Sequence, residues 1–131
     1  MDYTVLQNRI RTEYTGDVDL SAALDELYFS EAEDAADFPY GTFHIIANSS
    51  ALTAARAALE SLVIQFNLFD KGSDSGDLGD AKGKLETVFD PLVFQSGGHA
   101  YELERFFDDG PAKVQGFWQA SIQYRVTIAP S

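Results

Sequence analysis

The last part of the chain alternates apolar and polar residues more regularly than any other segment, and this pattern constrains the fold most. Every second residue from 118 to 128 is apolar: Trp118, Ala120, Ile122, Tyr124, Val126 and Ile128. Successive side chains of a β-strand point to opposite faces of the sheet. The segment is therefore predicted to be a strand with one buried face and one face that is wet or partnered.

Further segments have the apolar spacing of strands or helices. Residues 62–69 alternate with period two, and residues 42–47 are rich in β-branched and aromatic side chains. The expected strands cover residues 42–47, 62–69, 99–107 and 118–128, and the expected helices cover residues 3–13, 20–27 and 78–89. Asp19 is the expected N-cap of the short second helix. We expect a short extended piece at Tyr28 and Phe29, a connection across residues 51–58 and a turn at residues 108–111.

This order of elements indicates an α+β fold. The predicted architecture is a mainly antiparallel sheet of about four to five strands, with helices packed on one face. A chain of 131 residues is long enough to bury a substantial core in one domain. No internal repeat or linker divides it, so a single domain over residues 1–131 is expected.

Composition excludes several classes of protein. The formal net charge is −12, from 21 acidic and 9 basic residues, which argues against a reader of nucleic-acid sequence and against docking on anionic lipid. Cysteine is absent, which excludes disulfides, thiolate metal sites and cysteine nucleophiles. No apolar run is long enough to cross a bilayer, and the first residues lack a signal peptide's pattern. We expect a soluble protein that is not exported through a cleaved signal.

The polar residues give no catalytic or metal-binding motif. His44 and His99 each stand alone in a strand pattern, without acidic residues at metal-ligand or triad spacing. A calcium loop beginning at Asp74 would need oxygen ligands where Gly76 and Leu85 stand. No catalytic residue, metal or cofactor is therefore predicted. A pair of carboxylates in a cleft between helix and sheet stays open as an enzymatic alternative.

Aromatic residues gather at the ends of the last expected hairpin. Phe106, Phe107, Phe117 and Trp118 fit a stacking platform for a base, a subunit contact or core packing. Trp118 is in phase with the apolar side of its strand, which favours the core. Phe106 and Phe117 are out of phase with the larger sides of their strands, which favours a partner surface.

The order of these segments resembles the tail terminator or tail-completion proteins of long-tailed bacteriophages. The features that carry the resemblance are an N-terminal helix, an acidic stretch leading to Phe38-Pro39-Tyr40, the strand at residues 62–69, a helix ending across residues 85–92, and the closing strand at residues 122–126. They cover nearly the whole chain. The alanine-rich insert at residues 51–58 departs from the pattern.

The resemblance implies a structural subunit without catalytic residues. Such subunits form a ring, usually a hexamer, at the head-proximal end of the tail tube, where they stop tube polymerisation and offer a docking surface to head-completion or connector proteins. The expected partners are further copies of the chain, the tail tube protein, a head-completion protein, and double-stranded DNA that passes without sequence-specific binding. The expected location is the virion, with assembly in the host cytoplasm and no membrane contact.

A closed ring needs a contact between two different patches of neighbouring subunits. We expect Phe106, Phe107 and Phe117 in this contact, together with exposed hairpin edges that can extend the sheet between subunits. Acidic loops facing a channel would repel DNA phosphates and let the duplex slide. The candidates for this lining are Asp74, Asp77 and Asp80, or residues 31–37. A solvated acidic surface that only aids solubility explains either segment equally well.

The sequence is also compatible with two other functions. A head-completion protein, such as a stopper or connector of the same particle, shares most of the physical arguments. A small acidic α+β domain that binds a ligand or catalyses a reaction is the second alternative.

Overall fold

The computed structural model describes residues 3–32, 37–47, 60–72 and 75–130. Its elements are α1 (Thr4–Gly16), α2 (Val18–Ala23), β1 (Leu27–Phe29), β2 (Tyr40–Ala47), β3 (Glu60–Asp70), α3 (Gly76–Phe89), β4 (Leu92–Ser96), β5 (His99–Val114) and β6 (Phe117–Pro130). The connection expected across residues 51–58 lies outside the described residues. All seven expected helices and strands are present, with bounds that differ at their ends.

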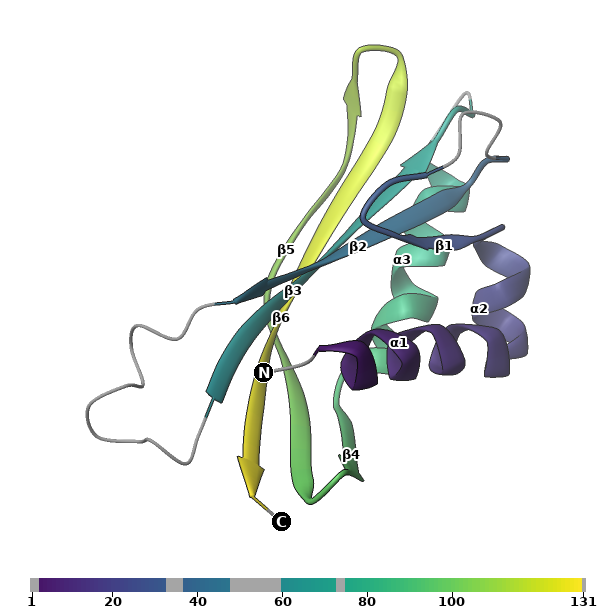
Figure 1. The fold of residues 1–131 in the computed structure, drawn as a ribbon. Helices are drawn as coiled ribbons and strands as arrows, with labels where there is room; N and C mark the ends of the chain where they lie inside the picture. The colour runs from purple at the N-terminus through teal and green to yellow at the C-terminus, as the bar shows by residue number, and fades with distance from the viewer. Residues whose placement is uncertain (1–2, 33–36, 48–59, 73–74, 131) are drawn as a thin grey trace.

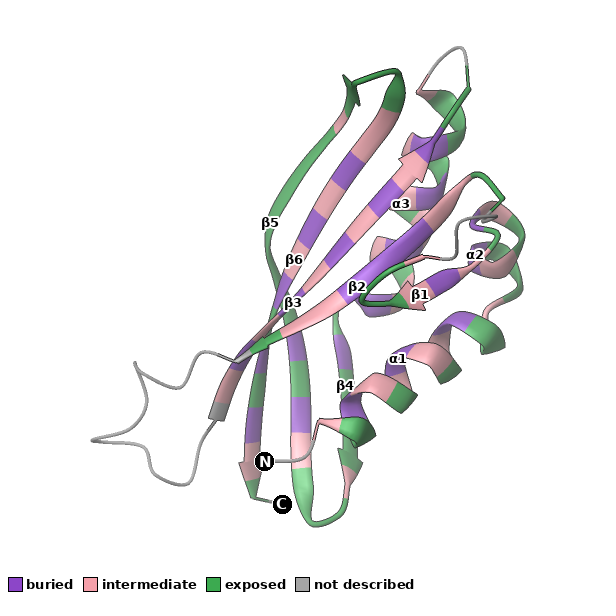
Figure 2. Ribbon diagram, turned by 45° about the horizontal axis from the view of Figure 1, so that its top comes forward, coloured by how far each residue is buried: buried purple, intermediate pink, exposed green. Residues whose placement is uncertain are grey.

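The strands form one curled six-stranded sheet in the order β1-β2-β3-β6-β5-β4 (Figure 1). Only the β1–β2 pair is parallel. The three helices lie on one side of this sheet (Figures 1 and 2). The α+β class is as predicted, but the sheet has six strands and is mixed. The two additional strands are β1, which contains the extended piece expected at Tyr28 and Phe29, and β4. They are three and five residues long, too short for a clear alternating pattern.

Strand β5 is longer than the sequence predicted. It continues through residues 108–111, where a turn was expected, and ends at Val114. Register shifts between Arg105 and Phe107 and between Asp109 and Ala112 take up the additional residues as bulges. A Cβ at Gly110, which has φ +90°, would lie 2.6 Å from the Gln119 carbonyl oxygen, so this position needs glycine. The turn between β5 and β6 is at residues 115–116, both with positive φ.

The start of α2 also differs from the expectation. Asp17, not Asp19, is the N-cap: its Oδ1 accepts a hydrogen bond of 2.8 Å from the Leu20 backbone N–H. Asp19 lies in the first turn, and the helix ends at Ala23 because Leu24 is extended. The helix is therefore shorter than residues 20–27.

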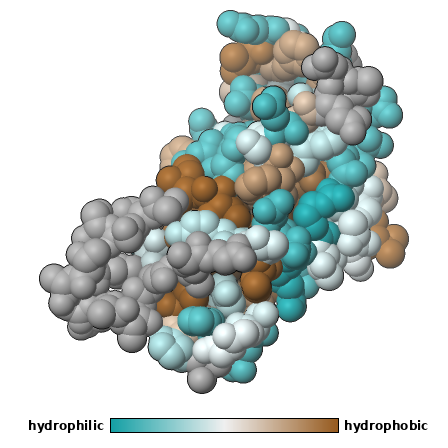
Figure 3. Space-filling view, in the orientation of Figure 1, coloured by the Kyte–Doolittle hydropathy of each residue, from teal (hydrophilic) through white to brown (hydrophobic). Residues whose placement is uncertain are grey.

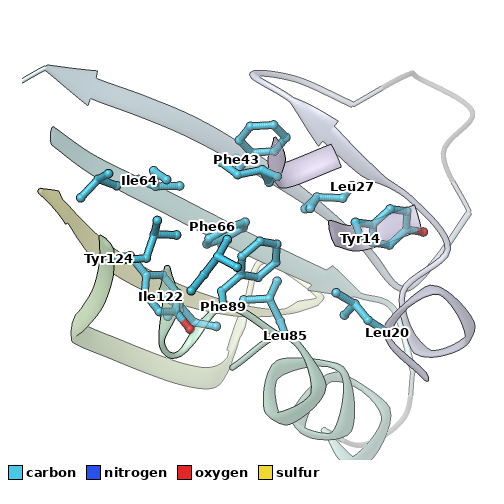
Figure 4. Close-up of a cluster of buried hydrophobic side chains, with 14 of the residues drawn as sticks. Tyr14, Leu20, Leu27, Phe43, Ile64, Phe66, Leu85, Phe89, Ile122 and Tyr124 are labelled. Carbon is cyan, nitrogen blue, oxygen red and sulfur yellow. The ribbon is translucent and has the colours of Figure 1, made fainter. Parts of the chain in front are cut away.

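The core lies between the helices and the inner face of the sheet. Phe66 of β3 is at its centre, with ring centroids 6.0 Å from Phe43, 5.0 Å from Phe89 and 5.8 Å from Tyr124 (Figure 4). The apolar side of the alternating pattern on β6 is buried here, as predicted. Trp118 is partly buried and packs against this core.

Tyr14 and Tyr124 are both buried in the core, and only one of their two hydroxyl groups has a hydrogen-bond partner among the described residues. The Tyr14 hydroxyl donates to the Leu24 carbonyl at 2.6 Å, and burial is the largest of the causes that raise its pKa to about 12. Burial also raises the pKa of Tyr124. Unlike Tyr14, the buried Tyr124 hydroxyl has no hydrogen-bond partner among the described residues. The two phenol groups should therefore contribute to stability with opposite signs.

We expect Tyr14→Phe to lower the free energy of unfolding by about 1–2 kcal/mol, because it leaves the buried Leu24 carbonyl unpaired. We expect Tyr124→Phe to raise it by about 1 kcal/mol, because it removes a buried polar group without a partner. Urea denaturation of both variants measures the two changes. Changes of the same sign would contradict this assignment.

Candidate interaction surface

The face of the sheet opposite the helices, called here the outer face, is the main candidate surface. No helix of the described residues covers it (Figure 2). Alternate residues of β2, β3 and β6 lie on it, most of them half-buried. The remaining alternate residues of these strands point into the core. A sheet with one covered face of this kind leaves the other available for a partner.

Four polar side chains form a hydrogen-bonded ladder across the outer face. The Gln123 amide donates to Gln65 Oε1 at 2.9 Å, and the Gln65 amide donates to Asn67 Oδ1 at 3.0 Å. The Ser121 hydroxyl donates to the same Asn67 oxygen at 2.9 Å. These bonds fix the side chains, and each amide keeps further donor or acceptor capacity for a partner. The sequence showed these residues only as the polar half of an alternating pattern.

Beside the ladder, a bulge in β5 exposes two phenylalanines. Phe106 is 44% and Phe107 46% exposed, and Phe107 is in register with Gln123 of the ladder. The Arg125 guanidinium lies over the Phe106 ring, 5.2 Å from its centroid. Phe106, Phe107 and Arg125 are called the bulge patch. Arginine and aromatic residues are the types most often found at the centre of protein contacts.

An ion-pair network joins the bulge to α3. Arg105 pairs with Glu86, with Asp90 at 3.1 Å and with Asp108 at 3.4 Å. Lys82 pairs with Glu86 at 3.3 Å and with Asp108 at 3.5 Å. The hydrogen bond to Glu86 raises the pKa of Arg105. Because these residues come from two elements, the network holds the bulge against the helix.

The end of the β5–β6 hairpin forms a second exposed patch. Phe117 is 39% and Val114 48% exposed. The Phe117 ring stacks on the Phe38 ring, with 5.7 Å between the ring centroids. The Lys71 ammonium lies 6.0 Å from the Phe117 ring, and the Lys113 ammonium lies 5.8 Å from the Trp118 ring. Val114, Phe117, Lys71 and Lys113 are called the hairpin end. Figure 3 shows hydrophobic residues beside hydrophilic ones where the hairpin projects.

The structure separates the three phenylalanines that were predicted as one contact. Phe107 pairs with Gln123, six residues along β6 from Phe117, which is about 20 Å in a strand. Phe106 and Phe107 lie in the middle of β5 because this strand continues past the expected turn. All three are exposed, but they belong to two patches. Their part in a subunit contact stays a prediction.

Asp77 and Asp80, two of the acidic residues predicted to line a channel, lie on the helical side of the sheet. Asp77 and Asp80 are exposed on α3 and border a hollow of about 330 Å³ with Ala22, Ala23 and Pro39. Asp80 pairs with Lys84 at 3.1 Å. Asp74 lies outside the described residues. Facing a channel therefore stays a prediction for this segment.

The second acidic candidate, residues 31–37, begins on the other side of the sheet. Glu31 borders a hollow of about 480 Å³ on the outer face, with Tyr40, His44 and Asn67 among its lining residues. Residues 33–36 lie outside the described part of the chain. His44 is half-buried in β2, on the outer face, as its strand pattern suggested.

The described residues contain no group of three or more side chains that could hold a metal ion. Among these residues there is also no helix with the length and apolar character needed to cross a membrane. The features that the outer face and the hairpin end do present are exposed aromatic rings, cations held against them, and hydrogen-bonded amides.

Neither a protein-family model nor a curated protein matches this chain. Solved structures do match in fold. One, which carries only a sequence identifier, is 18% identical over 95% of this chain and 96% of its own, with a TM-score of 0.64. The bacteriophage SPP1 gp17 protein is 15% identical over 95% of this chain and 88% of its own, with a TM-score of 0.60. The chain shares the fold of these two proteins.

Proposed function

We propose that this protein is a structural subunit of a long-tailed bacteriophage and acts as its tail terminator. In this proposal it forms a ring at the head-proximal end of the tail tube, stops tube polymerisation and offers the surface on which the head-completion protein docks. The single observation that carries the proposal is the outer face with its exposed phenylalanines. The fold shared with the bacteriophage SPP1 gp17 protein supports it.

The outer face supports assembly because the sheet buries only one side within the subunit. The ladder and the bulge patch combine fixed polar groups with exposed aromatic rings, which is the composition of protein contacts. A ring also needs two different patches on each subunit. The bulge patch and the hairpin end, about 20 Å apart, fit that need.

The free edge of β5 is less suited to a subunit contact than the face. Beyond Leu103, β5 has no neighbour on the side of β4 in the described structure. This edge carries two bulges, Asp108, Asp109 and Pro111, and such features protect sheet edges from pairing with other chains. We therefore assign the contact to the two patches and not to extension of the sheet.

The acidic surface supports passage of DNA through such a ring. With a net charge of −12 on each copy, carboxylates that face a channel would repel the phosphates of the duplex. Asp77 and Asp80 are exposed and so accessible for this role. In the proposed ring this repulsion keeps the duplex from binding to the channel wall, and the ring makes no sequence-specific contact with the DNA.

Particles assembled without this protein test the proposal. We expect overlong tails by electron microscopy, because nothing stops the growth of the tube, and we expect the purified protein to restore normal length. Tailless heads that lose their DNA would instead assign the protein to head completion. Normal particles would contradict both roles.

A further inference from the structure

Three basic side chains lie against aromatic rings and do not pair with carboxylates of the described residues. Of the nine Lys and Arg residues, all but Arg56 lie in the described part of the chain. Five of them form ion pairs with carboxylates: Arg9, Arg11, Lys82, Lys84 and Arg105. Lys71, Lys113 and Arg125 have no carboxylate partner among the described residues, and each lies against an aromatic ring instead. In so acidic a chain, cations without carboxylate partners are scarce.

Two of these three cations, Lys71 and Lys113, belong to the hairpin end. Lys71 lies over the Phe117 ring on the outer face of the sheet. Lys113 lies over the ring of Trp118, which packs against the core on the inner face. The hairpin end therefore presents one ammonium group on each face of the sheet. Figure 1 shows this hairpin as the part of the chain that projects furthest at its end of the sheet.

We propose that the hairpin end is the basic contact through which one copy of this protein binds carboxylates on a second copy. Each ammonium group has three N–H donors, and contact with a ring leaves donors for a carboxylate. Val114 and Phe117, exposed beside the two lysines, would be buried on contact and would exclude water from the ion pairs. The inference rests on the proposed ring and names the chemistry of one of its two contact patches.

Charge complementarity selects a second copy as the occupant. Two copies of net charge −12 repel each other at long range, although salt screens this repulsion beyond about 8 Å. Short-range attraction needs a place where free cations meet carboxylates, and the hairpin end supplies the cations. Duplex DNA fits less well, because binding to its phosphates depends on clustered Lys and Arg residues, and this end offers two lysines in a chain of net charge −12.

Charge reversal tests the proposal. We expect Lys71→Glu/Lys113→Glu to weaken self-association at least about tenfold in sedimentation experiments, because like charges then face each other. Lys71→Arg/Lys113→Arg keeps the charges and should associate like the native protein. The single variant Lys113→Glu should also weaken self-association. Lys84→Glu is its matched control, because it makes the same change in net charge on α3, and it should weaken self-association less. Circular dichroism and thermal unfolding check that the variants keep their fold.

Zero-length cross-linking identifies the contact directly. A carbodiimide joins a lysine amine to a carboxylate as an amide, taking up the released water to become a urea. In a mixture of isotope-labelled and unlabelled copies, we expect peptides that join Lys71 or Lys113 of one copy to Asp or Glu of another. If these cross-links are absent from associated protein, or if the charge-reversed variant associates like the native one, the inference is wrong, whereas capping of tubes would still support the ring. A hairpin end that binds duplex DNA in place of a second copy would also overturn it.

If the native protein shows no self-association at any soluble concentration, capping of tail tubes decides. A Lys71→Glu/Lys113→Glu variant that still caps tubes then overturns the inference. Native protein that neither associates nor caps tubes overturns the proposed function as well. The two failures are therefore distinguishable by the tube assay.

Discussion

Replacing Gly41 by valine is expected to lower the free energy of unfolding by about 3 kcal/mol, the upper part of the usual range for overpacking a core. Gly41 is buried in β2, in register with Leu27 of β1 and Leu68 of β3. A Cβ there would lie 2.8 Å from Leu68 Cδ2, 3.1 Å from Leu27 Cδ1 and 3.3 Å from Leu24 Cδ2. All three leucines are fully buried, so none can move without disturbing its own neighbours.

The substitution should act most strongly on β1. This strand has only three residues, and its parallel pairing with β2 depends on backbone bonds such as Gly41 N–H to the Glu26 carbonyl at 2.9 Å. A larger side chain at Gly41 pushes Leu27 outward and loosens that pairing. Gly41→Ala adds one methyl group to the same space, so we expect a smaller loss of about 1–2 kcal/mol.

Gly83→Ala is the matched control for Gly41→Ala. A Cβ at Gly83, inside α3, meets no described atom within 4 Å. Alanine favours a helix over glycine, so this variant should gain about 0.5–1 kcal/mol. Urea denaturation of the variants gives the comparison. A Gly41→Val protein as stable as the native one would contradict the packing described around β2.

The elements that the sequence predicted best are those with a long, uninterrupted period. Strands β6 and β3 alternate over eight residues or more, and the face that carries most of their large apolar side chains is the buried one. Strand β4 has two buried side chains, Leu92 and Phe94, and two positions do not establish a period. The pattern at residues 108–111 has the composition of a turn, but pairing with β6 makes it a bulge. Tertiary pairing decided that segment, and local composition cannot show it.

The candidate surface was predictable in part. The phase of Phe106 and Phe117 within their strands indicated exposed rings, and both are exposed. The bulge that places Phe107 beside Phe106 depends on register with β6. The contact of Lys71 with Phe117 depends on pairing between residues 46 positions apart. Such contacts follow from the sheet order, which the periodicity of single strands does not specify.

Replacing both phenylalanines of the bulge patch, Phe106→Asp/Phe107→Asp, is expected to abolish tail completion. In the proposed ring these rings are at the centre of a subunit contact. Loss of one central aromatic residue typically costs about 2 kcal/mol or more of binding free energy, so loss of both weakens the contact about a thousandfold. The two new carboxylates also add repulsion between copies that already carry −12 each.

The measurement is rescue of particles that lack the protein. Purified native protein should restore normal tail length and infectivity, whereas the double variant should leave overlong tails. Val18→Asp is the control, because Val18 is 82% exposed on α2, on the helical side and away from the bulge patch, and it should rescue like the native protein. Both phenylalanines lie outside the buried core, so circular dichroism and thermal unfolding of the double variant should stay close to native. A correctly folded double variant that completes tails normally would show that the bulge patch is not a subunit contact, because two buried charges at the centre of an interface cannot be accommodated without loss of binding.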